Sequence, residues 1–204
     1  MRVESLTVEN RAPAGRVLIE SFRDYPYMRH ALRDAGSDYE AHLEKLILFI
    51  LDARWARRHP VLGVRRDGSL CAVATVVEPG PAEPSAEVEA LFQRLRRDIG
   101  ADAVDWMERY EEAAHVGRPE APFHYLGMLG VLPDRQGSGH GKRLVDDVKR
   151  RAREHPTSTG VVLNTEVERN VALYEHLGFE VVGEGDVGEL HTWCMLWPAP
   201  GDAP

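Results

Sequence analysis

A glycine-rich stretch, residues 136–141, stands immediately before a basic amphipathic segment that begins with Lys142 and Arg143. The first turn of a helix carries unsatisfied backbone N–H groups and roughly half a positive charge. Glycine lets those groups turn inward and lets an anion approach the backbone closely. The spacing therefore predicts a phosphate-binding turn, and a plain strand-to-helix turn is the alternative. The candidate residues are Gln136, Gly137, Ser138, Gly139, His140, Gly141 and Lys142.

Two common phosphate motifs do not fit this stretch. A Walker loop requires glycine five positions before the Gly-Lys pair, where Gln136 stands, and a Ser or Thr for magnesium where Arg143 stands. A dinucleotide fingerprint that starts at Gly137 requires glycine in place of Lys142. The loop therefore does not predict a magnesium-bound nucleotide or a dinucleotide.

A second pair of chemically useful side chains, Asn170 and Tyr174, is spaced by one helical turn. Two such residues share one face of a helix. A phenol with a pKa near ~10 can protonate a leaving group of similar basicity. From these residues alone, a core tyrosine that packs near Leu177 and Phe179 is the better interpretation.

The composition describes a globular protein with a sizeable core. Of the 204 residues, 43% are hydrophobic and 28% are charged, and the formal net charge is −8. An acidic chain is not expected to bind nucleic acid or acidic membranes, and it mildly favours a cationic small partner. The two cysteines, Cys71 and Cys194, suit neither a disulfide framework nor a metal site, so no metal is expected.

The sequence also predicts where the protein acts. No apolar run approaches the ~20 residues of a membrane span. Charged residues and Pro13 interrupt residues 1–17, so this segment is not predicted to be a signal peptide. We expect a cytoplasmic protein with no membrane contact, built as a single domain over 1–198 with a flexible tail at 199–204.

The hydrophobic patterns predict one α/β domain with a mixed, mostly antiparallel sheet and a parallel step around the glycine loop. Asp67-Gly68 between two apolar runs predicts a hairpin. Asn10 is a candidate helix cap. The expected strands are within 2–10, then 61–77 as the hairpin, 123–132, 160–165, 179–185 and 190–197. The expected helices are about 14–22, a short one after Pro26, 38–59, the inserted pair 85–97 and 102–116, the segment after the glycine loop, and 169–178.

Two motifs at this spacing resemble the GNAT superfamily of acyl-CoA-dependent N-acetyltransferases. The run Val131-x-Pro133 followed by Gln136-x-x-Gly139-x-Gly141 resembles its pyrophosphate loop, and "NVALY" with "LGF" at 170–179 resembles its closing motif. The resemblance spans about 123–197. It implies the GNAT fold, whose central parallel pair of strands is splayed and flanked by helices, with a helical insert between the early strands and the motif strand. It also implies acetyl-CoA as co-substrate.

The same resemblance implies roles for single residues. The backbone of Leu129 and Val131 would hold the pantetheine arm of CoA, and Gly130 between them is a candidate bulge that separates the strands. Tyr174 becomes the expected general acid. Asn170 would bind the CoA arm or cap its helix.

The ends of the chain resemble the puromycin N-acetyltransferases more narrowly, in "SFRDYPYMRH" at 21–30 and "HTWCM" at 191–195. This resemblance implies a small-molecule amine acceptor, such as an aminoacyl-nucleoside antibiotic, and therefore a role in antibiotic resistance. Tyr25 is implied as a catalytic residue that deprotonates or positions the amine. A protein or peptide amine is an alternative acceptor, and a non-catalytic acyl-CoA sensor is an alternative function.

The candidate acceptor site comprises four residues, each with a structural alternative. Tyr25 is equally well a half-buried aromatic at a helix break, and His124 a satisfied strand-end histidine. Glu166 would relay a proton through water or lie solvated in a loop, and Trp193 would wall an aromatic acceptor or join the core. A monomer and a homodimer are both compatible with the sequence.

Overall fold

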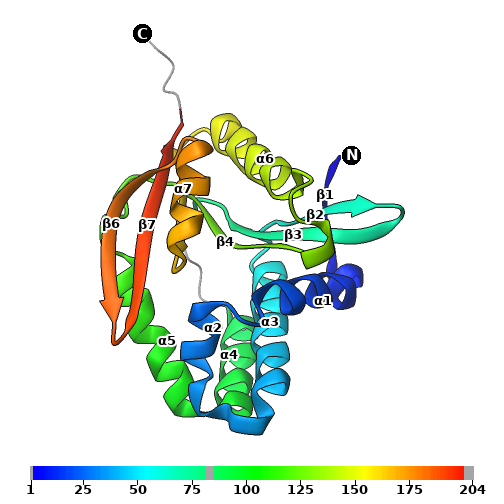
Figure 1. Cartoon of the computed structure of the whole chain (residues 1–204), viewed down its shortest axis with the longest axis vertical. Helices are drawn as coiled ribbons and strands as arrows, with labels where there is room; N and C mark the ends of the chain where they lie inside the picture. Colours follow the sequence, from blue (N-terminus) through cyan, green and yellow to red (C-terminus); the bar gives the residue numbers. More distant parts are fainter. Residues whose placement is uncertain (1, 81–84, 200–204) are drawn as a thin grey trace.

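The computed structural model describes residues 2–80 and 85–199. Its strands form one sheet in the order β1-β2-β3-β4-β5-β7-β6, in which β4 and β5 are parallel and the other neighbours antiparallel. Figure 1 shows helices on both faces of this sheet. The predicted fold class, a mixed and mostly antiparallel sheet with flanking helices, is confirmed.

The elements follow the predicted order along the chain. The strands are β1 (Val3–Ser5), β2 (Val61–Arg66), β3 (Ser69–Val77), β4 (His124–Val131), β5 (Gly160–Thr165), β6 (Glu180–Val187) and β7 (Leu190–Pro198). The α-helices are α1 (Arg11–Phe22), α2 (Pro26–Ala31), α3 (Tyr39–Ala56), α4 (Ala86–Ile99), α5 (Ala101–Ala114), α6 (His140–Glu154) and α7 (Glu168–His176). Short 3-10 helices are η1 (Val8–Asn10), η2 (Arg33–Asp38) and η3 (Pro133–Arg135).

The hairpin of β2 and β3 turns where the sequence predicts. Asp67 and Gly68 have φ angles of 52° and 79°. Positive φ at both central residues is the geometry of the two-residue turn that follows the natural twist of paired strands. The Asp-Gly pair therefore fixes the register of the first half of the sheet.

The N-terminal strand is shorter than predicted. β1 ends at Ser5, and the chain turns into η1 where the alternating pattern indicated further strand. The Asn10 side chain accepts the Thr7 N–H at 3.1 Å. Asn10 is the N-cap residue of α1, as predicted, but its side chain closes the preceding turn and makes no capping hydrogen bond to α1.

A bulge in β4 opens the centre of the sheet. The register of β4 against β3 shifts so that Gly127 has no residue opposite it. The hydroxyl of Thr75 accepts the Met128 N–H at 3.0 Å and satisfies the backbone beside the bulge. An extra residue in one strand bends that strand and changes its twist.

The bulge was predicted at Gly130, and this position is wrong. Gly130 pairs regularly with Val73 of β3. A Cβ atom at Gly130 would lie 2.9 Å from the Ser21 side chain of α1. Close packing of α1 on the sheet explains this glycine.

Strands β4 and β5 separate soon after they meet. Their parallel pairing joins His124–Leu126 to Val161–Leu163 only, although β4 continues to Val131 and β5 to Thr165. From Gly127 onward the edge of β4 that faces β5 carries no strand partner among the described residues. This gap is the predicted splayed pair.

Along the chain, the helical insert α4–α5 follows β3 and precedes β4, as predicted. In space, α5 runs along β6 (Figure 1). Glycines make this contact very close. A Cβ atom at Gly183 would lie 2.1 Å from the carbonyl oxygen of Val116, and one at Gly117 would lie 2.2 Å from that of Val182. The insert is therefore sealed against the sheet by direct backbone contact.

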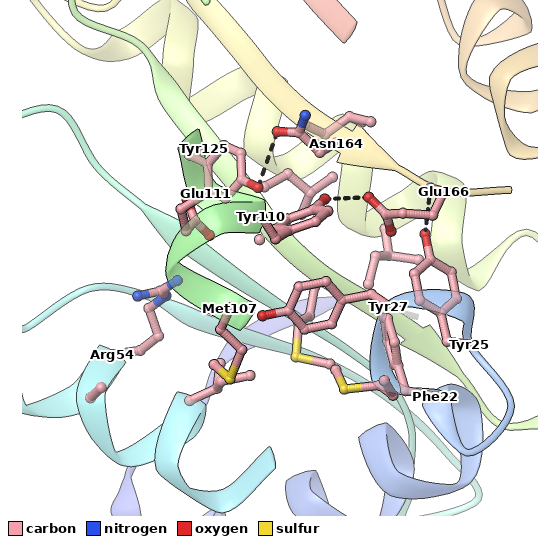
Figure 2. Close-up of a pocket in the computed structure, with 18 of the residues that line it drawn as sticks. Phe22, Tyr25, Tyr27, Arg54, Met107, Tyr110, Glu111, Tyr125, Asn164 and Glu166 are labelled. Atoms are coloured by element: carbon pink, nitrogen blue, oxygen red, sulfur yellow. Dashed lines mark hydrogen bonds between the residues drawn. The ribbon is translucent and has the colours of Figure 1, made fainter. Parts of the chain in front are cut away.

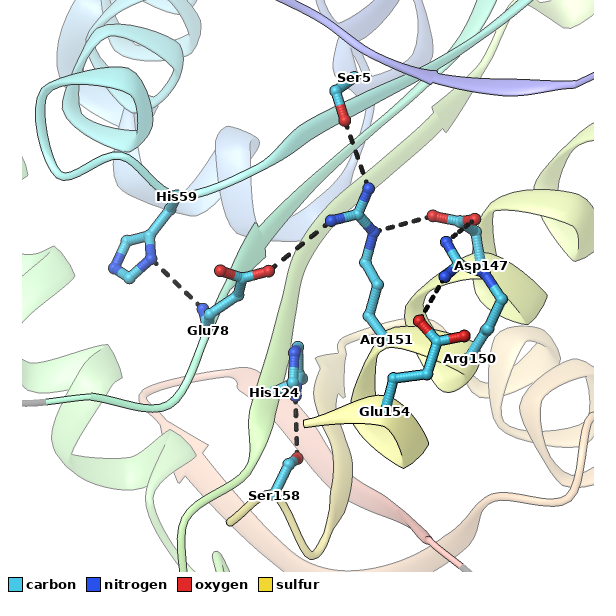
Figure 3. A network of polar contacts seen from close by, with 9 residues as sticks. All are labelled: Ser5, His59, Glu78, His124, Asp147, Arg150, Arg151, Glu154 and Ser158. Atoms are coloured by element: carbon cyan, nitrogen blue, oxygen red, sulfur yellow. Dashed lines mark hydrogen bonds and ion pairs between the residues drawn. The ribbon is translucent and has the colours of Figure 1, made fainter. Parts of the chain in front are cut away.

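Two apolar layers hold these elements. One lies between the sheet and α1, α3, α4 and α5, and the other lies beneath α6. At its C-terminal end, α6 is tied to the sheet edge by Arg151, which donates to Ser5 at 3.3 Å and lies 3.7 Å from Glu78 (Figure 3). The N-terminus of α6 is thereby held at the end of β4.

Within residues 2–80 and 85–199, no helix is long and apolar enough to cross a membrane. The same residues contain no cluster of three potential metal ligands. Of the predicted tail, only Ala199 belongs to the described residues, and its N–H donates to Thr159 O at 2.9 Å. Residues 81–84, between β3 and α4, also lie outside the described residues.

Candidate active site

A cavity of about 250 Å³ adjoins the gap between β4 and β5 (Figure 2). Its lining comes from α1, α2, α3, α5, α7 and both strands of the parallel pair. Tyr25, Glu166, Asn170 and Tyr174, which were predicted separately from both halves of the chain, all line this cavity.

Aromatic rings form much of the cavity wall. The rings of Tyr27 and Tyr110 meet edge to face with centroids 4.6 Å apart, and those of Phe22 and Tyr25 lie 4.9 Å apart. Tyr125 belongs to the same lining. Such rings offer flat apolar surfaces with a hydroxyl group at one point, which suits a planar organic ligand.

Glu166 is a largely buried carboxylate on this wall. It accepts hydrogen bonds from the Tyr110 hydroxyl and, at 2.9 Å, from the Thr192 hydroxyl (Figure 2). Burial raises the pKa of Glu166 because the charged form is disfavoured away from water, while these hydrogen bonds act in the opposite direction. Glu166 is therefore no solvated loop acid. A raised pKa makes it a stronger base toward a bound ammonium group.

Tyr25 sits beside Glu166 at the bend before α2. Its hydroxyl lies 3.1 Å from Thr165 Oγ1 and accepts the Glu166 N–H at 3.3 Å. Burial, reinforced by the charge of Glu166, raises the pKa of Tyr25 well above its ordinary value. The phenol thus stays protonated at neutral pH, and its hydroxyl orients groups instead of removing protons.

Asn170 and Tyr174 project from one face of α7 into the cavity. Asn170 Nδ2 donates to Thr165 Oγ1 at 3.2 Å. The Tyr174 ring packs against Phe179 with centroids 5.6 Å apart, so this residue belongs both to the core and to the cavity wall. Burial raises the pKa of Tyr174 to about 12, so the phenol stays protonated at neutral pH and is a weaker acid than a free tyrosine.

The glycine loop forms the N-terminal entrance of α6. Gly137 and Gly139 have φ angles of 73° and 76°, in the left-handed region that favours glycine. No heavy atom lies within 4 Å of the Cβ position of either residue. The loop with Ser138 therefore presents open backbone at a helix N-terminus, and this arrangement fits a pyrophosphate group.

Positive charge surrounds this loop. The imidazole of His140, the first residue of α6, is buried, and neither ring nitrogen has a hydrogen-bond partner. Burial and the charges of Arg66, Arg143 and Arg135 lower the pKa of His140. Lys142 is paired with Asp146 at 2.7 Å. An anion bound at the loop would balance the field of the arginines.

The unpaired edge of β4 leads from the glycine loop toward the cavity. Leu129 and Val131 pair with β3 on one side and meet no β5 residue on the other. Gln136 Nε2 donates to Val131 O at 3.3 Å. Gly141 packs near both strand residues, because its Cβ position is 3.4 Å from Leu129 and 3.6 Å from Val131.

His124 does not line the cavity. It is buried at the start of β4, where Nδ1 lies 2.8 Å from the Ser158 hydroxyl (Figure 3). Burial, together with His155 and Arg151, lowers the pKa of His124 to about 4. The structure therefore favours the satisfied strand-end histidine over the predicted acceptor contact.

Trp193 does not line the cavity either. Successive side chains of a strand point to opposite faces. Because Thr192 reaches Glu166, Trp193 faces away, where it packs on the core beneath α6 and meets the His191 ring with centroids 4.4 Å apart. The core alternative thus describes Trp193 better than the predicted contact with the acceptor.

Several residues in and next to the cavity lining were not predicted from the sequence. Tyr110 of α5 and Thr192 of β7 hold Glu166, and Arg54 of α3 lines the far side of the cavity. Trp106 and Tyr110 stand one helical turn apart on α5 and stack with centroids 5.8 Å apart. The spacing of these two aromatic residues could have indicated an aromatic wall. The same spacing is also typical of the face of a helix that packs on an ordinary core.

Comparisons with known proteins agree with this geometry. Residues 99–181 match the family model described as "Acetyltransferase (GNAT) domain". Over 106 residues the chain is 29% identical to the peptidyl-lysine N-acetyltransferase YjaB of Escherichia coli (strain K12), covering 52% of this chain and 69% of that protein.

Solved structures share the whole fold. A structure described as histone acetyltransferase HPA2 and related acetyltransferase, from Corynebacterium glutamicum ATCC 13032, aligns with a TM-score of 0.73 at 21% identity and covers 100% of this chain and 97% of that one. A GNAT family acetyltransferase from Brucella melitensis in complex with acetyl-CoA aligns with a TM-score of 0.54 at 18% identity, covering 100% and 90%.

The splayed sheet, the loop at α6 and the domain match define the class of this protein. It is an enzyme, an N-acetyltransferase with the GNAT fold and a GNAT acetyltransferase domain. Enzymes of this fold use acetyl-CoA, as in the Brucella complex. The narrower resemblance to the puromycin N-acetyltransferases is not among these findings and bears only on the proposal below.

Glu166→Gln should gain stability relative to the native protein as the pH rises. The folded state raises the Glu166 pKa above the unfolded value of about 4.5. The contribution of Glu166 is thus complete below that value and is lost as the pH rises through the folded-state pKa. Glutamine has no such loss. Urea unfolding at acidic and neutral pH measures the difference, with the exposed Glu175→Gln as control. A difference between Glu166→Gln and the native protein that does not change with pH would contradict the burial argument.

Proposed function

We propose that this enzyme transfers the acetyl group of acetyl-CoA to the primary amine of a small molecule with a flat, apolar or aromatic body. The single observation that carries the proposal is the buried Glu166 carboxylate in an aromatic cavity beside the splayed strands. An aminoacyl nucleoside such as puromycin belongs to this class of acceptors.

The donor would lie in the gap between β4 and β5. Its pyrophosphate would bind the backbone N–H groups around Gly137 and Gly139 at the start of α6, and its pantetheine arm would pair with the free edge at Leu129 and Val131. This arm would lead the thioester to the side of the cavity that is lined by Glu166, Asn170 and Tyr174.

The acceptor would bind with its amine toward Glu166. An ammonium group must lose a proton before its nitrogen can attack the thioester carbon, and Glu166 would take that proton. Tyr25 and Thr192 hold Glu166 and its neighbours in place through hydroxyl contacts. As the carbon–sulfur bond breaks, the Tyr174 hydroxyl would protonate the thiolate, which releases CoA with a thiol. The attacking nitrogen would lose its second proton as the amide forms, and this proton would restore the Tyr174 phenol, while Glu166 would return its proton to water.

The sealed insert favours a small acceptor. Helix α5 contributes Met107, Tyr110 and Glu111 to the cavity wall and is fixed against β6 by close backbone contact, so widening the cavity for a polypeptide would require this packed helix to move. A peptide lysine remains the second candidate, because the relative from Escherichia coli is named a peptidyl-lysine N-acetyltransferase. A lysine side chain alone is narrow enough to enter an aromatic cavity.

The experiment that tests the proposal measures release of the CoA thiol from acetyl-CoA across a panel of amines. The panel contains phenethylamines, puromycin, a linear polyamine and a lysine-containing peptide. We expect turnover with small aromatic amines and little with the peptide. Turnover with the peptide alone would overturn the small-molecule proposal and leave the acetyltransferase class intact.

Tyr174→Phe should lower kcat by about 10²–10⁴-fold, the range for loss of a general acid. The ring and its packing on Phe179 remain, so acetyl-CoA affinity and Tm should change little. Steady-state kinetics and calorimetry measure both. Tyr39→Phe is the control, because Tyr39 lies outside the cavity and bonds to Arg23 O. If kcat stays within a few-fold, Tyr174 is only a packing residue.

Gly139→Asp should weaken acetyl-CoA binding by at least about tenfold, since a carboxylate would lie beside the pyrophosphate. Gly139→Asn is the matched control, because asparagine has the same shape and tolerates positive φ without the charge. Calorimetric titration of both variants separates charge from backbone strain. Equal acetyl-CoA affinities of the two variants would contradict the assignment of the pyrophosphate to this loop.

A further inference from the structure

Arg54 places a positive charge inside the cavity without a partner. It projects from α3, and its Nε atom is buried with no hydrogen-bond partner. Within the described parts of the chain, its guanidinium forms no ion pair, and the acidic neighbour Glu111 lies instead 3.9 Å from Arg118. Nη2 is 3.4 Å from the Cβ position of Gly127, so the guanidinium reaches the bulge of β4.

An unpaired charge in such a position is costly. Taking a guanidinium out of water has a large desolvation penalty, which only a hydrogen-bonded counter-charge repays. Burial lowers the pKa of Arg54, and the nearby charge of Arg57 adds to this effect, while Tyr125 and Glu111 oppose it. The position of Arg54 in the last turn of α3 and the nearby Glu111 favour the charge only in part, and an anionic ligand group would supply the missing hydrogen-bonded partner.

Arg54 and Glu166 place opposite charges on two sides of the cavity, whose lining also includes Glu111 and Arg57. Figure 2 shows Arg54 and Glu166 on opposite sides of the lining, with Tyr27 between them. An amine at Glu166 and an anion at Arg54 would therefore be separated by the length of the aromatic wall. A planar guanidinium binds a carboxylate through two parallel hydrogen bonds.

We propose that the acetyl acceptor is an amine that also carries a carboxylate, held by Arg54 at the end of the cavity opposite Glu166. This inference rests on the proposed function and narrows its substrate class. Arg54 is then a specificity-determining residue that binds the acceptor away from the reacting nitrogen. An aminoacyl nucleoside offers Arg54 only neutral oxygen and nitrogen atoms, so it ranks below a carboxylate-bearing aromatic amine.

The test compares two acceptors that differ in one group, phenethylamine and its para-carboxylate derivative. A charged hydrogen-bonded pair contributes roughly 1.5–3 kcal/mol, which corresponds to about 10–150-fold in affinity. We therefore expect the native enzyme to show at least about tenfold higher kcat/KM for the carboxylate compound, expressed mainly in KM. Equal values, or a preference for phenethylamine or puromycin, would overturn the inference.

Variants of Arg54 test whether this residue causes the preference for the carboxylate compound. Arg54→Gln should raise KM for the carboxylate compound until the preference disappears, and Arg54→Lys should keep part of it. Arg97→Gln, which removes an exposed charge on α4 outside the cavity, should keep the preference in full. If Arg54→Gln retains the preference, the anion site lies elsewhere and the assignment is wrong. If Arg54→Gln does not fold, the comparison of the two acceptors on the native enzyme still tests the inference.

The outcome also separates this inference from the function on which it rests. Thiol release with phenethylamine and no carboxylate preference contradicts only the role of Arg54. Absence of release with every small amine, together with release by a lysine peptide, contradicts the small-molecule function itself.

Discussion

The early separation of β4 from β5 is the constraint on which the rest of the structure depends. Backbone N–H and C=O groups inside a protein need partners, and a sheet normally supplies them. Here the parallel pairing ends at Leu126, and the extra residue Gly127 turns the following part of β4 into an inner edge. An extended ligand can complete such an edge as a strand would. The helix after β4 places its N-terminus at one end of this gap, and α7 after β5 places Tyr174 along it.

The buried polar groups around this gap reduce the stability of the fold. Burial raises the pKa of Glu166, and Arg54 forms no ion pair with any described residue. Such groups oppose folding, since each loses water without full compensation. Two continuous apolar layers, on the two faces of the sheet, offset this cost. Rigid packing around the polar groups also fixes their positions before a substrate binds.

The sequence predicted those features that depend on neighbouring residues. The Asp67-Gly68 turn, the glycine loop and the spacing of Asn170 and Tyr174 each follow from local geometry. The acceptor side depends on packing across the chain, where local spacing carries little information. Tyr110 meets Glu166 across 56 residues of sequence, and no short motif marks that contact.

The errors in the acceptor site have the same origin. In the run Thr192-Trp193 the threonine faces Glu166 and the tryptophan faces the core beneath α6, a choice that depends on which face of β7 lies toward Glu166. Helix α5 has two roles that no local sequence pattern reveals. It packs the insert against β6, and its Tyr110 hydroxyl donates a hydrogen bond to Glu166. That hydrogen bond lowers the pKa of Glu166 against the effect of burial. Moving α5 to admit a larger acceptor would break this bond and also admit water to Glu166, and the two changes act on its pKa in opposite directions, so the size of the cavity and the pKa of Glu166 are linked through one helix.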